Sequence, residues 1–134
     1  MTIPSQFASW LAVAERDGEG GLKAEPPAIV RGRTRAMRLS LPVHQTYGDY
    51  SLGTFAAVLR AAPGGSALAT YAVTPESVTG GERPLLLVLE PAAQSGLPAS
   101  DPNQKLIELF LDITFTPSGG TADTVVSTRQ LVRD

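Results

Sequence analysis

Hydrophobic and polar residues alternate along the first half of residues 105–134. Successive side chains of a strand point to opposite faces, so this period of two predicts a β-strand with one buried face. The apolar positions that we assign to the core are Ile107, Leu109, Leu111, Ile113 and Phe115. Residues 117–120, PSGG, break the pattern, and a β-branched run follows over residues 124–132. We therefore expect a C-terminal β-hairpin.

Shorter patterns of the same kind precede the hairpin. Alternation over residues 37–43, 55–60 and 68–74 predicts half-buried strands, and turn-forming residues separate them. Residues 85–89, LLLVL, are apolar throughout, which is typical of a central strand covered on both faces. We expect six or seven strands about 8–15 residues apart, without βαβ spacing. This organisation predicts an all-β protein, an antiparallel β-sandwich of the immunoglobulin-like or jelly-roll-like kind.

The N-terminal residues follow a helical pattern instead. Apolar residues recur there at i, i+3, i+4 and i+7, the spacing of one helix face. They are Phe7, Trp10, Leu11 and Ala14. We predict a short α-helix and glycine linker in residues 1–21, and the sandwich domain in residues 22–134. So short a helix needs a surface that buries its stripe. Either the chain's own sandwich supplies that surface, or a neighbouring subunit does, with Phe7, Trp10 and Leu11 as partner-binding residues.

The chain has one basic cluster, in residues 31–38. Alternation places Arg31, Arg33 and Arg35 on one face of an expected strand. Three interpretations are open: a solvated strand edge, an interface with acidic groups of an adjoining subunit, or a nucleic-acid contact. No aromatic residues are interleaved for base stacking, which disfavours nucleic acid. We therefore name these three arginines as candidate partner-binding residues.

Composition narrows the function classes. The 134 residues carry a formal net charge of −2 and no cysteine. With this net charge the chain has no overall positive charge that would hold nucleic acid. Without cysteine it cannot form disulfides, thiolate metal sites or cysteine nucleophiles. No uninterrupted apolar run, residues 85–89 included, is longer than five residues, which is too short to cross a bilayer. The N-terminus has no cationic flank before an apolar core, so we expect no signal peptide.

Candidate catalytic residues are sparse. His44 is the only histidine, and a lone histidine without cysteines is a poor zinc ligand, so we expect a loop residue. Glu108 and Asp112 share one strand face about 13 Å apart, too far for a glycosidase pair, and we expect both to be solvated. The paired glycines lack the phosphate-loop spacing and are interpreted as turns. We expect no catalytic activity, no cofactor and no metal.

The order of the segments resembles a known family. An arginine–glycine strand (IVRGRTRAMRLSL) precedes a strand ending in arginine (YSLGTFAAVLRAAPGG). A strand–turn–strand stretch follows (LATYAVTPESVTGGERPLLLVLEPAAQSGLP), and then the hairpin, with an aspartate inside its first strand. Over residues 29–134 this order resembles the small β-sandwich domains of tailed-phage virion proteins, such as the N-terminal domain of the baseplate upper protein family.

The resemblance implies a non-enzymatic structural role in a phage tail, baseplate or fibre attachment, as an adaptor or decoration subunit. Its expected partners are other virion proteins and copies of itself, without nucleic acid or membrane. The implied location is the virion, assembled in the host cytoplasm. The alternative is a carbohydrate- or protein-binding β-sandwich module of bacterial origin, although sugar-binding faces need several exposed aromatic platforms. A small hydrolase has almost no support.

Overall fold

The computed structural model describes residues 11–13, 26–99, 103 and 106–134. These residues form eight strands and one short 3₁₀ helix, which confirms the all-β prediction. The elements are β1 (Leu11–Val13), β2 (Ile29–Val30), β3 (Arg35–Pro42), β4 (Gly53–Arg60), β5 (Ala67–Pro75), β6 (Glu82–Leu89), η1 (Pro91–Gln94), β7 (Leu106–Pro117) and β8 (Asp123–Arg133). The predicted C-terminal hairpin is present as the antiparallel pair β7–β8.

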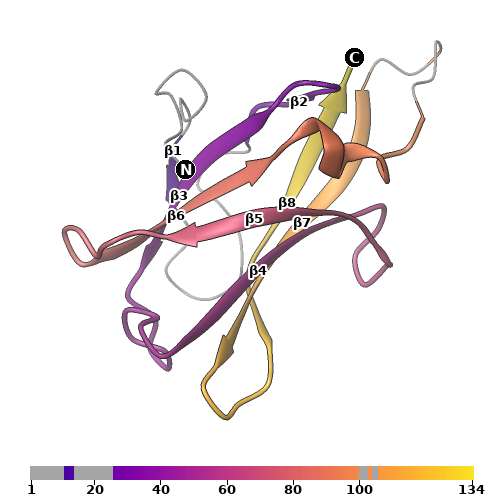
Figure 1. Ribbon diagram of the computed structural model, residues 1–134. Coiled ribbons are helices and arrows are strands. Elements are labelled where there is room, and N and C mark those ends of the chain that lie inside the picture. The colour runs from indigo at the N-terminus through magenta and orange to yellow at the C-terminus, as the bar shows by residue number, and fades with distance from the viewer. Residues whose placement is uncertain (1–10, 14–25, 100–102, 104–105) are drawn as a thin grey trace.

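The eight strands pair in one continuous order, β1-β3-β6-β5-β4-β7-β8-β2. The long strands are antiparallel to their neighbours, whereas β1 runs parallel to β3 and β2 runs parallel to β8. The sheet is therefore mixed, and it curls until it is nearly closed into a barrel (Figure 1). The sequence led us to expect an antiparallel arrangement throughout. The parallel pairs β1–β3 and β2–β8 could not be predicted, because strands of two or three residues are too short to show a periodic pattern.

Strand β5 changes its partner halfway along. Residues 67–71 pair with β4, and residues 72–75 pair with β6 on the other side. This switch divides the sheet into a half containing β3 and β6 and a half containing β4, β7 and β8 (Figure 1). Strands that switch partners in this way form the corners of curled sheets. The two halves enclose the core between them.

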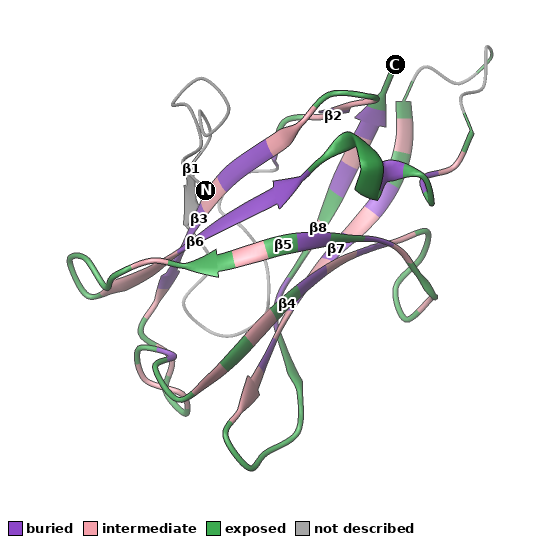
Figure 2. Cartoon of the chain, viewed as in Figure 1, coloured by how far each residue is buried: buried purple, intermediate pink, exposed green. Residues whose placement is uncertain are grey.

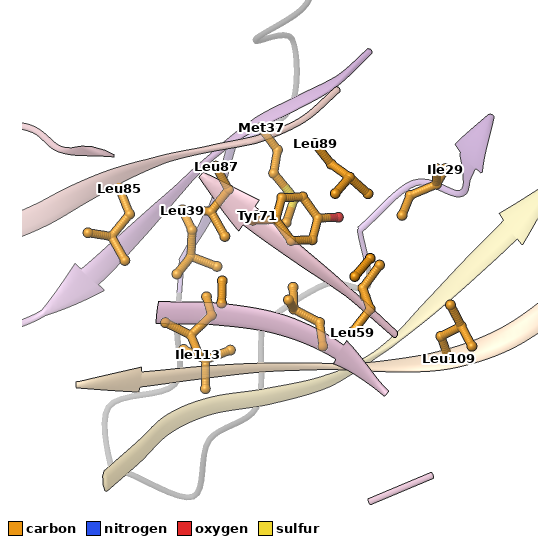
Figure 3. Close-up of a cluster of buried hydrophobic side chains, with 14 of the residues drawn as sticks. Ile29, Met37, Leu39, Leu59, Tyr71, Leu85, Leu87, Leu89, Leu109 and Ile113 are labelled. Carbon is orange, nitrogen blue, oxygen red and sulfur yellow. The ribbon is translucent and has the colours of Figure 1, made fainter. Parts of the chain in front are cut away.

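The core gathers side chains from every long strand (Figure 3). The five alternating residues predicted for β7 all contribute, and Leu109, Leu111, Ile113 and Phe115 are at most 1% exposed. Residues 85–89 of β6 are buried on both faces, as predicted for a central strand (Figure 2). Three of them, Leu85, Leu87 and Leu89, point into the core, while Leu86 and Val88 face outward.

The N-terminal prediction needs a correction at Leu11. Leu11–Val13, expected within a helix, form strand β1 opposite residues 38–40 of β3. The physical reason is that the edge of β3 offers unpaired backbone groups, and a short isolated helix is marginal. Phe7, Trp10, the glycine linker and the boundary between residues 21 and 22 lie outside the described residues. Among the residues described, no helix is long and apolar enough to span a membrane.

Candidate interaction surface

A groove of about 390 Å³ lies on the outer face of β5 and β6. Because alternation directs Leu85, Leu87 and Leu89 into the core, Leu86 and Val88 form the groove's floor. The strand register places Ala72 opposite Val88 and Thr74 opposite Leu86, so β5 supplies the wall. The floor is apolar and continuous with Ala36 of β3, which is opposite Val88, and these residues form a second buried cluster separate from the core.

Charged residues close both ends of this groove. At one end, Arg38 Nε lies 2.9 Å from Glu76 Oε1, and Nη2 lies 3.4 Å from Oε2. Arg38 is opposite Leu86 in the register, and its guanidinium reaches Glu76. At the other end are Glu90 and Ala93 of η1. No described residue forms an ion pair with Glu90, so no described side chain neutralises the negative charge at this end.

The three predicted partner-binding arginines do not share one strand face. Arg31 and Arg33 lie in the turn between β2 and β3, and only Arg35 belongs to a strand. The turn follows from Gly32, whose φ of 81° ends strand β2. Arg31 Nε pairs with Asp134 Oδ1 at 3.2 Å, and Arg33 is exposed. The prediction that the three arginines share one strand face is therefore wrong. Their role in binding remains a prediction.

Arg35 also departs from the solvated-edge interpretation. Its side chain turns toward the protein interior, and Nη2 donates to the carbonyl oxygen of Pro27 at 2.7 Å. Burial lowers the pKa of Arg35, an effect that the nearby Tyr71 hydroxyl opposes. No described carboxylate forms an ion pair with it. Arg35 therefore belongs to the interior of the barrel rather than to an exposed basic face.

Five aromatic rings pack together at the end of the barrel away from Arg35, and the sequence patterns did not predict this cluster. His44 stacks on Tyr47 at 4.5 Å between ring centroids, and Tyr50 meets Phe115 edge-on at 5.1 Å. Phe55 contacts both Tyr50 and Phe115. Apart from the stacked pair of His44 and Tyr47, these rings pack at tilted or edge-on angles, and Tyr50 and Phe115 are buried. They therefore form no flat exposed platform of the kind that binds sugars. The missed signal was three aromatic residues, Tyr47, Tyr50 and Phe55, within nine positions of the sequence.

His44 lies in a loop, as predicted, and its ring has a structural contact. Nδ1 accepts hydrogen bonds from the backbone nitrogens of Thr46 and Tyr47 at 3.0 and 3.2 Å. The hydroxyl of Tyr47 in turn donates to Asp123 Oδ2 at 2.8 Å. The histidine therefore shapes the loop between β3 and β4.

The carboxylates predicted to be solvated are each ion-paired. Glu108 pairs with Arg129 at 3.1 Å and Asp112 pairs with Arg60 at 3.1 Å. The Glu108 pair is exposed, but Asp112 has a side chain only 16% exposed, so the solvated interpretation is wrong for Asp112. Within the described ranges, no group of three or more histidine, aspartate or glutamate residues is placed to hold a metal ion.

Comparison with known proteins finds no protein family that matches this chain and no curated protein that matches it. Its function therefore has to be argued from its own surface.

Proposed function

We propose that this protein is a non-enzymatic component of a larger protein assembly and acts through protein–protein contacts. The observation that carries the proposal is the groove between the outer faces of β5 and β6, with Leu86 and Val88 at its floor. Grooves with apolar floors and polar rims are typical of sites that receive an anchoring side chain. A phage virion is the assembly that the order of strands suggests.

The arrangement of the sheet is compatible with this setting. The two half-sheets separated at β5 face each other across one core, as the sheets of a sandwich do. We propose that the domain is a variant of the sandwich in which the strand order stays continuous. Adaptor or decoration subunits of this size need no catalytic centre, because their function is to present complementary surfaces.

The partner that fits the groove is a polypeptide segment with a large apolar side chain and a basic residue nearby. The floor of Leu86 and Val88 accepts the apolar group, and Glu90 attracts the cation. The described residues that line the groove include no aromatic ring, so they offer a sugar no stacking surface. We therefore favour a protein partner over a carbohydrate.

A second copy of the chain offers such a segment. Phe7 and Trp10 are apolar anchors that precede Arg16 in the sequence. Tryptophan is enriched among residues that dominate binding energy at interfaces. We propose that residues 1–18 of one subunit bind the groove of the next through Phe7 and Trp10, while Leu11–Val13 stay paired with β3 of their own chain. This proposal fits the expectation of a homo-oligomer.

The proposal is tested by sedimentation velocity on the full chain over a range of concentrations. We expect concentration-dependent association that Ala72→Arg weakens at least tenfold, because arginine fills the groove wall. Trp10→Ala should weaken association to a similar extent. Ala56→Arg is the matched control, because Ala56 is also an exposed strand alanine but lies on β4. Association that is absent in the parent chain, or equal in all four proteins, would overturn the proposal.

A cross-linking experiment shows which copy occupies the groove. The natural chain has no cysteine, so the pair Trp10→Cys and Ala72→Cys introduces the only two thiols. Mixing two singly substituted proteins under oxidising conditions should produce a covalent heterodimer if the segment crosses between subunits. A link formed only within one chain that carries both cysteines would contradict the exchange between copies.

A further inference from the structure

Exposed apolar side chains gather at the end of the barrel where β3, β5 and β7 end (Figure 1). Across the described residues four large apolar side chains are exposed, and three of them are Val43, Leu52 and Val78. Val43 and Leu52 lie in the loop between β3 and β4, and Val78 lies in the turn between β5 and β6. Leu52 protrudes most, at 77% exposed. Exposed apolar residues that gather in one region are typical of a contact surface.

The loop that carries Leu52 is held in place from both sides. Arg83 of β6 donates through Nε to the carbonyl oxygen of Asp49 at 3.0 Å and through Nη2 to Ser51 Oγ at 3.1 Å. On the other side, Ser118 N donates to the carbonyl oxygen of Leu52 at 3.0 Å. These bonds fix the loop and leave the Leu52 side chain exposed. A contact residue that is fixed before binding loses less conformational entropy when the complex forms.

Acidic side chains accompany the apolar ones. Asp123, at the start of β8, accepts from the Tyr47 hydroxyl of the β3–β4 loop at 2.8 Å, so the β7–β8 turn belongs to the same surface. The ion pair of Glu76 with Arg38 is neutral as a whole. The described residues place four further charged side chains at this end, three acidic and one basic: Asp49, Glu82, Asp123 and Arg83. Their sum is negative.

The opposite end of the barrel also has an exposed apolar side chain, but beside basic ones. Leu106, at 45% exposed, is opposite Arg133 in the register of β7 and β8. The carbonyl oxygen of Arg133 accepts from Arg31 N at 2.8 Å, which brings the β2–β3 turn and Arg33 to the same end. Arg33 and Arg133 are exposed, and no described carboxylate forms an ion pair with either.

The charges at this second end sum to a positive value. Arg31 is neutralised by Asp134, with 3.2 Å between Nε and Oδ1. Glu90 is the one carboxylate without an ion pair that the described residues place there, and it stands against the two exposed arginines, Arg33 and Arg133. The barrel therefore has an acidic end bearing Leu52 and a basic end bearing Leu106.

The two ends complement each other. We propose that the acidic end of one subunit binds the basic end of a second copy of this chain, so that subunits join head to tail. Two unlike surfaces on one molecule link copies into a ring or a filament. Opposite charges orient the subunits as they meet, and two like ends would repel each other. The inference rests on the assembly role proposed above, but it uses the ends of the barrel rather than the groove of Leu86 and Val88.

Sedimentation velocity at about 10 mM salt tests the contact, because exposed charges act over about 30 Å at that ionic strength. Trp10→Ala is the parent, since it weakens the contact proposed for residues 1–18. In this parent, Glu82→Arg and Arg33→Glu should each weaken association at least tenfold. No described residue forms an ion pair with Glu82 or Arg33, so neither substitution breaks an internal ion pair. Ala56→Arg and Ala56→Glu are the matched controls, because they add the same charges at an exposed position between the two ends.

Mixing the two variants tests the head-to-tail order. Glu82→Arg keeps an intact basic end, and Arg33→Glu keeps an intact acidic end. An equimolar mixture should therefore recover the association that neither variant has alone. Contact between two like ends would instead leave one of the variants associating as the parent does. Leu52→Ser and Arg133→Glu replace any variant of the same end that circular dichroism shows to be unfolded.

Salt separates this contact from the groove. Raising the salt to about 0.5 M should suppress association of Trp10→Ala, whereas the apolar groove contact of the natural chain should persist. The head-to-tail contact is excluded if Trp10→Ala is monomeric at low salt, if the folded charge variants associate as it does, or if their mixture stays monomeric. Such a result, with Ala72→Arg still weakening association of the natural chain, leaves the groove proposal intact. The reverse pattern leaves the head-to-tail contact alone.

Discussion

Arg60 and Asp112 form an ion pair between neighbouring strands β4 and β7, with 3.1 Å between Nε and Oδ2. Each of the two side chains also makes a hydrogen bond to a further residue. Arg60 Nη1 donates to the carbonyl of Gly65 in the next turn, at 2.6 Å, and Ser127 Oγ of β8 donates to Asp112 Oδ1 at 2.8 Å. The two side chains are 26% and 16% exposed. This partly buried network therefore connects β4, β7 and β8 and the turn that leads into β5.

Replacing Asp112 with asparagine should reduce the free energy of unfolding by about 1–3 kcal/mol, the usual cost of losing a hydrogen bond to a charged group. Arg60 would keep its hydrogen bond to the carbonyl oxygen of Gly65 but would lose the negative charge of Asp112. Glu108→Gln is the matched control, because Glu108 also pairs across strands, with Arg129, but at an exposed site. Exposed pairs contribute about 0–1 kcal/mol. Urea unfolding of both variants measures the difference, and equal costs would show that the burial of Asp112 has no effect.

Leu111→Ala should cost roughly 2–5 kcal/mol, because Leu111 is fully buried and its truncation leaves a cavity. Thr114 lies on the other face of β7 and is only partly covered. Thr114→Ala should therefore cost well under 1 kcal/mol. Chemical denaturation of the two variants gives both values. Similar costs would indicate that a partner or another part of the chain covers the outer face of β7.

The long strands could be predicted because their burial follows a simple period. The alternation in β7 gave its core face correctly, and the uniformly apolar residues 85–89 predicted a strand covered on both sides. Strand β1 could not be found in this way. Leu11–Val13 also fits a helical stripe, and only the unpaired edge of β3 favours the extended form. Tertiary pairing outweighs a weak local pattern over so few residues.

The sites were less predictable than the fold. The groove depends on which outward residues of β5 and β6 are opposite each other, and register is not visible in either strand alone. The basic end of the barrel joins Arg31 to Arg133, which are far apart in the sequence. Alternation did place Arg35 on one face of a strand, but it could not say that this face was the inner one.

The three tyrosines should ionise above their usual pH. Burial raises the pKa of Tyr71 to about 12, although Arg35 opposes the shift, and burial raises the pKa of Tyr50 to about 12. The hydrogen bond to Asp123 raises the pKa of Tyr47. Ultraviolet titration of the folded protein should therefore show little ionisation of Tyr50 and Tyr71 at pH 10. The urea-unfolded chain should be half ionised near that pH.

These shifts also determine how stability depends on pH. Well below pH 10 each buried phenol is protonated in both the folded and the unfolded state. Between pH 10 and about 12 the unfolded state releases protons that folded Tyr50 and Tyr71 retain, so stability must fall as pH rises. Tyr71→Phe should make this decline shallower in urea unfolding experiments at successive pH values. An unchanged slope would show that the Tyr71 hydroxyl is not shielded from solvent.

Gly96 allows the 3₁₀ helix η1 to approach β5 closely. A Cβ atom at this position would collide with the carbonyl oxygen of Leu68, a backbone atom that cannot rotate away. Gly96→Ala should therefore displace η1 from β5 and reduce the free energy of unfolding by about 1–3 kcal/mol, the range for overpacking. Ser95→Ala, at the exposed neighbouring position, should change stability by less than about 0.5 kcal/mol.

Gly96→Ala should also affect the proposed self-association. Ala93 of η1 and Glu90 form one end of the groove, so a displaced η1 should also weaken the self-association proposed for residues 1–18. Sedimentation velocity on folded Gly96→Ala, beside Ser95→Ala, measures that effect. Loss of stability with unchanged association would show that the partner contacts only the part of the groove formed by β5 and β6. Loss of both would place η1 within the interface, because Ser95→Ala alters the same turn without moving the helix.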